Sequence, residues 1–170
     1  MGGLQLRAPI QERLDEFVPP EGERWQFDRN VTDVFENMLA RSIPEYGMMR
    51  TLVFELGAML VQPDTSIVDL GCSKGDALAP FVRRFGAANR YIGAELSETM
   101  LDAARHRFAA LIDQGIVDIR RLDLRTEYPR EMASLTLAVL TIQFTPIEYR
   151  QRIMHRIAER TVTGGGIILV

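Results

Sequence analysis

From residue 66 onward, short apolar runs alternate with segments of helical spacing, and this alternation limits the fold more than any other feature. Strands are expected at residues 66–70, 90–94, 116–122, 135–144 and 167–170. The fourth run is almost continuously apolar, which is typical of a strand covered on both faces. The alternation predicts an α/β fold with a Rossmann-like, doubly wound, mainly parallel sheet and helices on both faces.

Capping signals place the helices between these strands. Gly86 is expected to end the first of them, while Ser97 caps the second and Gly115 ends it. The segment Thr145-Pro146-Ile147-Glu148 combines an N-cap, a first-turn proline and a capping-box glutamate before a third helix. The segment Thr163-Gly164-Gly165-Gly166 is expected to turn the chain into the last strand.

The chain before the first strand divides into two parts. Residues 1–26 mix prolines and charges without periodicity, so we expect a flexible N-terminal arm. Apolar residues then recur at helical spacing, in one run from Val31 to Leu39 and in a second from Tyr46 that follows Pro44 at a first-turn position. Two capping helices are therefore expected, inside one domain that spans residues 27–170.

The last predicted strand, residues 167–170, consists only of apolar residues, as is typical of a buried strand. Because an unpaired apolar strand at a sheet edge invites aggregation, we expect either that C-terminal strands of the complete fold are missing from this sequence or that something else covers the edge.

The loop after the first predicted strand carries an acid and two nearby glycines, in the stretch IVDLGCSKGDAL at residues 67–78. An isolated carboxylate is costly to bury, so Asp69 inside an apolar strand implies a polar partner. Gly71 and Gly75 would let the backbone approach a ligand, and free N–H groups near the next helix favour an anionic group. In doubly wound sheets this turn borders the ligand site.

Three cofactor-binding motifs compete for this loop. The phosphate motif G-x-x-x-x-G-K-[ST] is not matched by residues 71–78, and the dinucleotide motif G-x-G-x-x-G fails because Ser73 and Asp76 replace two glycines. The S-adenosylmethionine pattern, apolar-acid-apolar-Gly-x-Gly/Ser-x-Gly, is matched by residues 68–75. That cofactor offers an amino group to Asp69 and a carboxylate to backbone N–H groups, and it needs no phosphate clamp.

Two further acids end the neighbouring predicted strands. Glu95 could accept hydrogen bonds from ribose hydroxyls, and Asp123 from an adenine amino group, with the backbone N–H of Leu124 available to a ring nitrogen. We expect Asp69, Glu95 and Asp123 to converge on one pocket. The alternative is that Asp69 only holds its own loop and that the other acids cap helices or turns.

With these residues in place, the chain resembles a class I S-adenosylmethionine-dependent methyltransferase. More narrowly, it is similar to the carboxy-S-adenosylmethionine synthase family of bacterial wobble-uridine tRNA modification. The similarity runs from about Phe27 to the end. The motifs that carry it are Phe27-Asp28-x-x-Val31, Val34-Phe35, Arg41-Ser42-Ile43-Pro44-x-Tyr46, Val61-Gln62-Pro63, Asp69-Leu70-Gly71-Cys72-Ser73-x-Gly75, Ser97-x-x-Met100 and Thr141-x-Gln143-Phe144.

The resemblance implies a role for each matching position. Tyr46 would line the cofactor pocket, Gly71, Cys72 and Ser73 would contact the methionine part, Glu95 with Leu96 the ribose, and Asp123 with Leu124 the adenine. The chain departs from the family at Glu95-Leu96, where Asp-Asn is usual, and at Val139, where the family has an asparagine. The family's arginine for the extra carboxylate lies beyond Val170.

Composition excludes several classes of function. With 20 basic and 23 acidic residues, the net charge of -3 gives no strong signal for nucleic-acid binding, and no apolar run reaches membrane-spanning length. Cys72 is the single cysteine, which fits a reducing cytoplasm. It lacks a basic partner for nucleophilic catalysis, and neither His106 nor His155 has metal-ligand spacing.

The sequence therefore favours an S-adenosylmethionine-dependent methyltransferase that acts on an undetermined acceptor, with no catalytic base identified and no metal. The narrower alternative is a carboxy-S-adenosylmethionine synthase that takes prephenate as the carboxyl donor, and its discriminating feature is a cation beside the sulfonium. A non-catalytic cofactor-binding or interaction module is a third hypothesis. S-adenosylhomocysteine or the carboxylated cofactor are alternative ligands of the same pocket, and a homodimer is left open.

Overall fold

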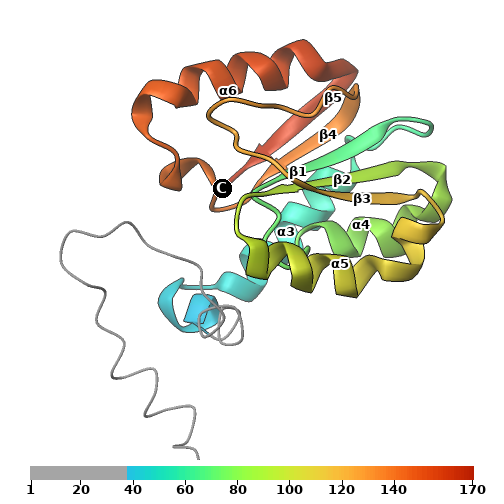
Figure 1. Cartoon of the computed structure of the whole chain (residues 1–170), viewed down its shortest axis with the longest axis horizontal. Coiled ribbons are helices and arrows are strands. Elements are labelled where there is room, and N and C mark those ends of the chain that lie inside the picture. The colour runs from blue at the N-terminus through green and yellow to red at the C-terminus, as the bar shows by residue number, and fades with distance from the viewer. Residues whose placement is uncertain (1–37) are drawn as a thin grey trace, which may run out of the picture.

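The computed structural model describes residues 38–170, which are built around a five-stranded parallel sheet (Figure 1). The strands are β1 (Ser66–Leu70), β2 (Arg90–Glu95), β3 (Val117–Arg121), β4 (Ala133–Ala138) and β5 (Thr161–Leu169). Their order across the sheet is β3-β2-β1-β4-β5. The chain therefore winds outward from β1 to β3 and then returns to place β4 on the other side of β1. The predicted doubly wound sheet is confirmed.

Helices cover both faces of this sheet (Figure 1). One face packs against α3 (Tyr46–Ala58), α4 (Leu78–Phe85) and α5 (Glu98–Asp113), and the other packs against α6 (Ile147–Arg160). Residues 38–42 are also helical, and short 3-10 helices occupy Gly86–Ala88 and Ile142–Phe144. Within residues 38–170, no helix has the length and apolar character needed to span a membrane.

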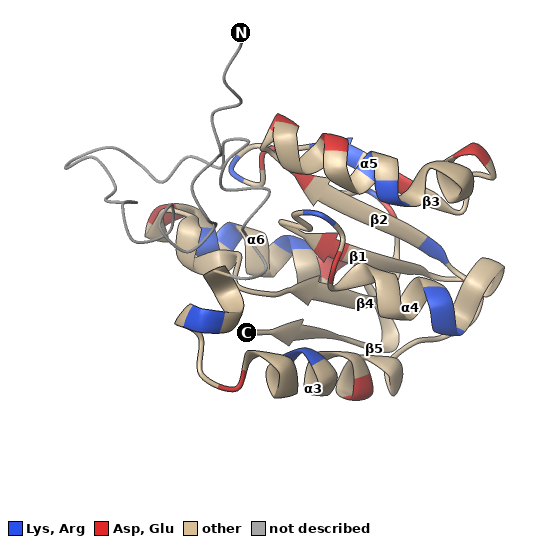
Figure 2. Cartoon of the chain, turned by 90° about the horizontal axis from the view of Figure 1, so that it is seen from below, with Lys and Arg blue, Asp and Glu red and all other residues tan. Residues whose placement is uncertain are grey.

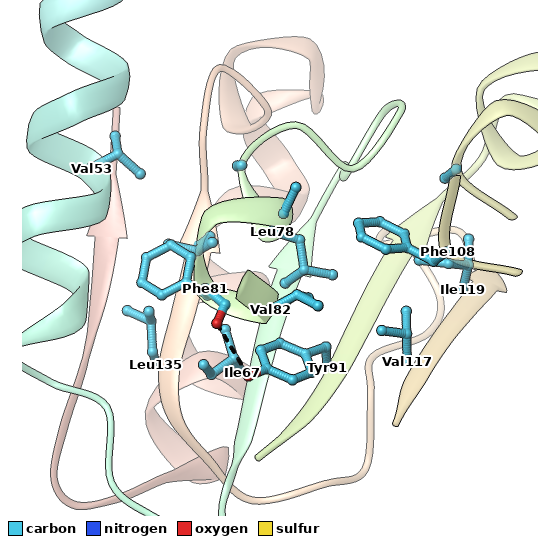
Figure 3. Packing of buried hydrophobic residues seen from close by; sticks show 14 of the residues in the cluster. Val53, Ile67, Leu78, Phe81, Val82, Tyr91, Phe108, Val117, Ile119 and Leu135 are labelled. Atoms are coloured by element: carbon cyan, nitrogen blue, oxygen red, sulfur yellow. Dashed lines mark hydrogen bonds between the residues drawn. The ribbon is translucent and has the colours of Figure 1, made fainter. Parts of the chain in front are cut away.

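The core divides into two clusters because successive side chains of a strand point to opposite faces. On the α3–α5 side, Ile67 of β1 packs with Phe81, Tyr91 and Leu135, all of which are fully buried (Figure 3). On the α6 side, residues of β1 and β2 pack with the buried isoleucines of α6. Every residue of β1 is buried, so the central strand is covered on both faces.

The fourth predicted strand is wrong at its C-terminal end. β4 stops at Ala138, and the chain then turns at Leu140, which has φ 55°. The Val170 N–H donates to the Ala138 carbonyl over 3.3 Å and the Leu140 N–H donates to the Val170 carbonyl over 2.9 Å, so pairing with the β5 side continues only as far as this turn. Apolarity at residues 139–144 thus reflects the lining of a cavity, described below, rather than a buried strand.

The glycine run was wrongly predicted as a turn, because Gly164, Gly165 and Gly166 lie inside β5. Between paired positions, β4 advances two residues, from 133 to 135, while β5 advances five, from 161 to 166, so β5 bulges. A Cβ on Gly165 would lie 2.7 Å from the Ser134 carbonyl oxygen. The glycines therefore allow β5 to approach β4 closely.

Two helix starts also differ from the prediction. Pro44 lies outside α3, whose N-cap is Glu45, and Pro146 rather than Thr145 is the N-cap of α6, with no side-chain cap. Ser97 is the N-cap of α5 as predicted. The predicted arm at residues 1–26 and the first capping helix up to residue 37 lie outside the described residues.

Tyr91 gives a test of the core. Its buried hydroxyl lies 3.2 Å from the Phe81 carbonyl oxygen (Figure 3) and 3.0 Å from that of Gly86, and its one proton is shared between these acceptors. We expect Tyr91→Phe to lower the free energy of unfolding by about 1 kcal/mol, since a net hydrogen bond is lost and no cavity forms. Phe81→Ala should cost about 3–5 kcal/mol through its cavity. Urea unfolding would measure both, and equal losses would contradict this view of the core.

Candidate functional site

Two adjoining cavities lie at the carboxyl ends of the strands. The first, called here the β1 cavity, has a volume of about 480 Å³ and lies between the loop after β1, the start of α3 and the segment after β4. The second, the β3 cavity, also has about 480 Å³ and lies at the ends of β2 and β3. Both are lined by Gly71, Glu95, Thr141 and Phe144. Because β1 and β4 lead to opposite halves of the sheet, the β1 cavity occupies the switch point where doubly wound folds bind ligands.

The structure brings all but one of the predicted site residues to these cavities. Tyr46, Asp69, Gly71, Cys72, Ser73 and Glu95 line the β1 cavity, and Leu96, Asp123 and Leu124 join Gly71 and Glu95 at the β3 cavity. Acidic residues mark the ends of β1 and β2 on the same side of the sheet (Figure 2). Gly75 lines neither cavity. A Cβ there would collide with the Phe108 ring, so its place is in the packing behind the loop.

A third hollow, of about 520 Å³, lies between α6 and residues 120–131. Leu124 is the one predicted site residue that it contains. The chemistry indicated by the sequence is therefore concentrated at the ends of β1 to β3 and not in this larger hollow.

Asp69 is the most unusual group of the β1 cavity. The residue is 1% exposed, and its Oδ2 atom has no hydrogen-bond partner among the described residues. Burial raises its pKa from 3.8 to about 7, although the nearby Arg50 charge lowers the pKa and the Glu95 charge raises it. An unpartnered carboxyl oxygen at a cavity wall is costly, and a ligand that donates a hydrogen bond would remove this cost.

The loop after β1 is held by its own backbone. The N–H groups of Gly71 and Cys72 both donate to the carbonyl of Ala94, at 2.8 and 3.0 Å. Gly71 has φ 69°, and a Cβ on it would lie 2.5 Å from the Thr141 hydroxyl oxygen. That hydroxyl in turn donates to the Leu70 carbonyl over 2.7 Å. Glycine is therefore required where β1 meets the segment after β4.

Glu95 fastens this loop to the end of β2. Its Oε2 atom accepts a hydrogen bond from the Ser73 N–H over 2.9 Å. Its Oε1 atom accepts from the N–H groups of Leu96 and Ser97 over 2.8 and 2.9 Å. The carboxylate thus shapes the junction of the two cavities with three of its acceptor positions.

Cys72 is a packing residue. Its buried side chain packs against Gly93, because a Cβ on Gly93 would lie only 2.8 Å from the Cys72 sulfur. Burial, with the negative charges of Asp69 and Glu95, raises the pKa of the Cys72 thiol well above its usual value. The thiol is therefore neutral near pH 7 and unsuited to nucleophilic attack, in agreement with the sequence interpretation.

Asp123 lies at the β3 cavity in a tight pair with Arg125. Its Oδ2 accepts from the Arg125 Nη2 over 2.6 Å, and its Oδ1 accepts from the Arg125 backbone N–H over 2.9 Å. These hydrogen bonds lower the pKa of Asp123, so the carboxylate is ionised. An ionised carboxylate with a free lone pair can still accept a hydrogen bond from a ligand.

Sequence reasoning missed several lining residues. Arg50 lies one helical turn after Tyr46 and donates from Nη1 to the Tyr46 hydroxyl over 3.2 Å. Its position four residues after an expected pocket residue was the available signal. Thr141 and Phe144 were hidden because residues 139–144 had been assigned to a strand. Within residues 38–170, no group of three His, Cys, Asp or Glu side chains is placed to hold a metal ion.

Comparison with known proteins places this geometry in a family. Residues 67–165, more than half of the chain, match the model of the methyltransferase domain family. The chain belongs to that family. The matched segment of this methyltransferase domain begins in β1 and ends in β5, and it contains the loop after β1, Glu95 and Asp123.

Several curated relatives of the domain carry one name, carboxy-S-adenosyl-L-methionine synthase. The protein from Actinobacillus succinogenes is 34% identical over 163 residues, which cover 95% of this chain and 64% of the relative. Those from Methylococcus capsulatus and Escherichia coli are each 32% identical, over 85% of this chain and 60% and 59% of their own lengths. The chain thus spans about 60% of the length of these relatives.

Solved structures share the fold of the methyltransferase domain at low identity. An S-adenosylmethionine-dependent methyltransferase from Clostridium acetobutylicum aligns with a TM-score of 0.64 at 16% identity, over 82% of this chain and 57% of the other. A methyltransferase from Thiobacillus denitrificans, in complex with S-adenosyl-L-homocysteine, aligns with a TM-score of 0.59 at 22% identity, over 84% and 55%. These likenesses concern the fold alone.

The raised pKa of Asp69 predicts a pH dependence of stability. Between about pH 4 and pH 7 the folded protein keeps the Asp69 proton that the unfolded chain releases, so Asp69 makes the free energy of unfolding fall as the pH rises through this window. Each unit of pKa shift corresponds to about 1.4 kcal/mol. We expect Asp69→Asn to remove this slope in urea unfolding at pH 4.5 to 8.

The matched control for this measurement is Asp102→Asn, because the Asp102 side chain is 75% exposed on α5. It should retain the wild-type slope. A wild-type slope in Asp69→Asn would show that Asp69 titrates normally in the folded protein.

Proposed function

We propose that the two cavities together bind S-adenosylmethionine and that the protein is a transferase for the methyl group of this cofactor. The observation that carries the proposal is the unpartnered Oδ2 of Asp69, which is buried at the switch point of a methyltransferase-family sheet. An ammonium group offers the donor and the charge that this atom lacks. The β3 cavity, with Asp123 at its wall, adjoins it closely enough to take the adenosyl part of the same ligand.

The predicted contacts divide along the ligand. Asp69 and the loop from Gly71 to Ser73 would face the amino-acid part, with Tyr46 on the opposite wall. Glu95 and Leu96 would lie at the ribose, and Asp123 with the Leu124 backbone at the adenine. Gly75 would act through the shape of the loop, since it lines neither cavity.

The chemistry of transfer would depend on position more than on acid–base groups. The bound cofactor would supply an electrophilic methyl sulfonium, and the protein would hold the acceptor in line with it and exclude water. Residues of the helical segments on either side of Pro44, with Leu140 and Phe144 after β4, form the apolar wall of the β1 cavity that can do this. The acceptor is a separate molecule that enters from this side.

The alternative is a carboxy-S-adenosylmethionine synthase in tRNA wobble-uridine modification, with prephenate as the second substrate. The curated relatives at 32–34% identity favour it. Such a reaction needs a cation to hold the extra carboxylate. The chain departs from the usual motif of that family at Glu95-Leu96 and at Val139, and these departures argue against the synthase. We place the general methyltransferase first for this reason.

Asp123 gives a direct test of cofactor binding. In isothermal titration the wild-type protein should bind S-adenosylhomocysteine, and Asp123→Ala should bind it roughly 10-fold more weakly, because a hydrogen bond to a charged acceptor is lost. Asp102→Ala, on the exposed face of α5, should bind like wild type. A folded wild-type protein that shows no binding would overturn the proposed function.

The ligand that co-purifies distinguishes methyl from carboxymethyl chemistry. We expect mass spectrometry of the protein's native extract to find S-adenosylmethionine or S-adenosylhomocysteine. A carboxymethyl sulfonium in its place would reject the first proposal in favour of the synthase.

A further inference from the structure

Arg50 is the one basic side chain among the described residues that line the β1 cavity, whose acidic lining residues are Asp69, Asp76 and Glu95. It projects from the second turn of α3, one turn after Tyr46. The site therefore combines one cation with a buried acid that lacks a partner. A ligand with one charge of each sign would complement this pair.

The guanidinium of Arg50 is only partly used by the protein. It makes one hydrogen bond, to the Tyr46 hydroxyl, and lies 5.8 Å from the centre of the Tyr46 ring. No salt bridge joins it to a carboxylate within 4.0 Å among residues 38–170. An arginine presents five N–H donors in a planar fork that suits a carboxylate, so most of its donors are available. The hydrogen bond to the Tyr46 hydroxyl holds the Arg50 guanidinium at the wall of the β1 cavity.

Four backbone N–H groups of the loop after β1 already have acceptors within the protein. The N–H groups of Gly71 and Cys72 are used by the Ala94 carbonyl, and that of Gly75 by the Cys72 carbonyl. The Ser73 N–H is used by Glu95. These four groups are not available to a carboxylate in the β1 cavity, whereas Arg50 carries both N–H donors and the opposite charge.

We propose that Arg50 binds the α-carboxylate of the cofactor's amino-acid end while Asp69 binds its ammonium group. This inference rests on the proposed function and assigns the charge recognition at the same site. It makes Arg50 a specificity residue: adenosyl ligands that lack the carboxylate, such as the decarboxylated cofactor, should be bound less tightly. The Arg50 charge lowers the pKa of Asp69, as expected for a cation close to a carboxyl group.

The experiment combines a change in the protein with a change in the ligand. The full chain and its Arg50→Met variant are titrated with S-adenosylhomocysteine and with the analogue that lacks only the α-carboxylate. Wild type should prefer S-adenosylhomocysteine by roughly 10- to 100-fold, as expected for a charge-assisted bidentate hydrogen bond. Arg50→Met should lose most of this preference, with little change in affinity for the analogue. Arg50→Lys should keep part of it, since it keeps the charge without the fork.

Arg105→Met is the matched control, because Arg105 lies on the exposed face of α5 and should leave both affinities unchanged. Thermal unfolding of each variant checks that it is folded. Equal weakening of both ligands by Arg50→Met would show that Arg50 only supports the cavity, and an unchanged affinity for S-adenosylhomocysteine would show that it faces a different group. Either result overturns the inference and leaves the proposed function standing. Failure of the wild type to bind either ligand would reject both.

Discussion

The burial of one carboxyl group in the central strand governs the arrangement of this domain. Asp69 lies in β1, which has β2 on one side and β4 on the other, and it is buried where it lines the β1 cavity. Residues 38–170 supply no partner for its Oδ2 atom. At the carboxyl end of β1, Gly71 has the positive φ that turns the chain. Thr141 holds the segment after β4 beside the β1 cavity through its hydrogen bond to the Leu70 carbonyl. The packing of a sheet that is covered on both faces offsets the free energy lost by burying an unsatisfied carboxyl group.

The strand and helix order could be predicted because it depends on local signals. Apolar runs and capping residues fix β1 to the residue, the end of α4 at Gly86, and β2 to within one residue. The acids at 69, 95 and 123 could be placed on one edge because parallel strands end together. Their shared position follows from the connectivity alone, without any knowledge of side-chain contacts.

What failed depends on contacts between distant segments. β4 ends before Leu140, whose positive φ turns the chain, and no local pattern reveals this turn. The glycines at 164–166 are typical of a turn, and only the closeness of the Ser134 backbone shows that they serve a bulged strand. Arg50 was overlooked for a related reason, since a single arginine on an amphipathic helix usually faces solvent. Its place at the cavity wall depends on how α3 packs against β5 and α4.

The way Glu95 holds the loop has a kinetic consequence. The Glu95 carboxylate accepts hydrogen bonds from three backbone N–H groups, one after β1 and two after β2. The loop after β1 therefore already has a fixed shape in the free protein. Little chain entropy is then left to lose when a ligand enters. The rate of ligand association should accordingly be set by encounter and orientation rather than by a slow folding of the loop. Selectivity among adenosyl compounds should then lie in their dissociation rates.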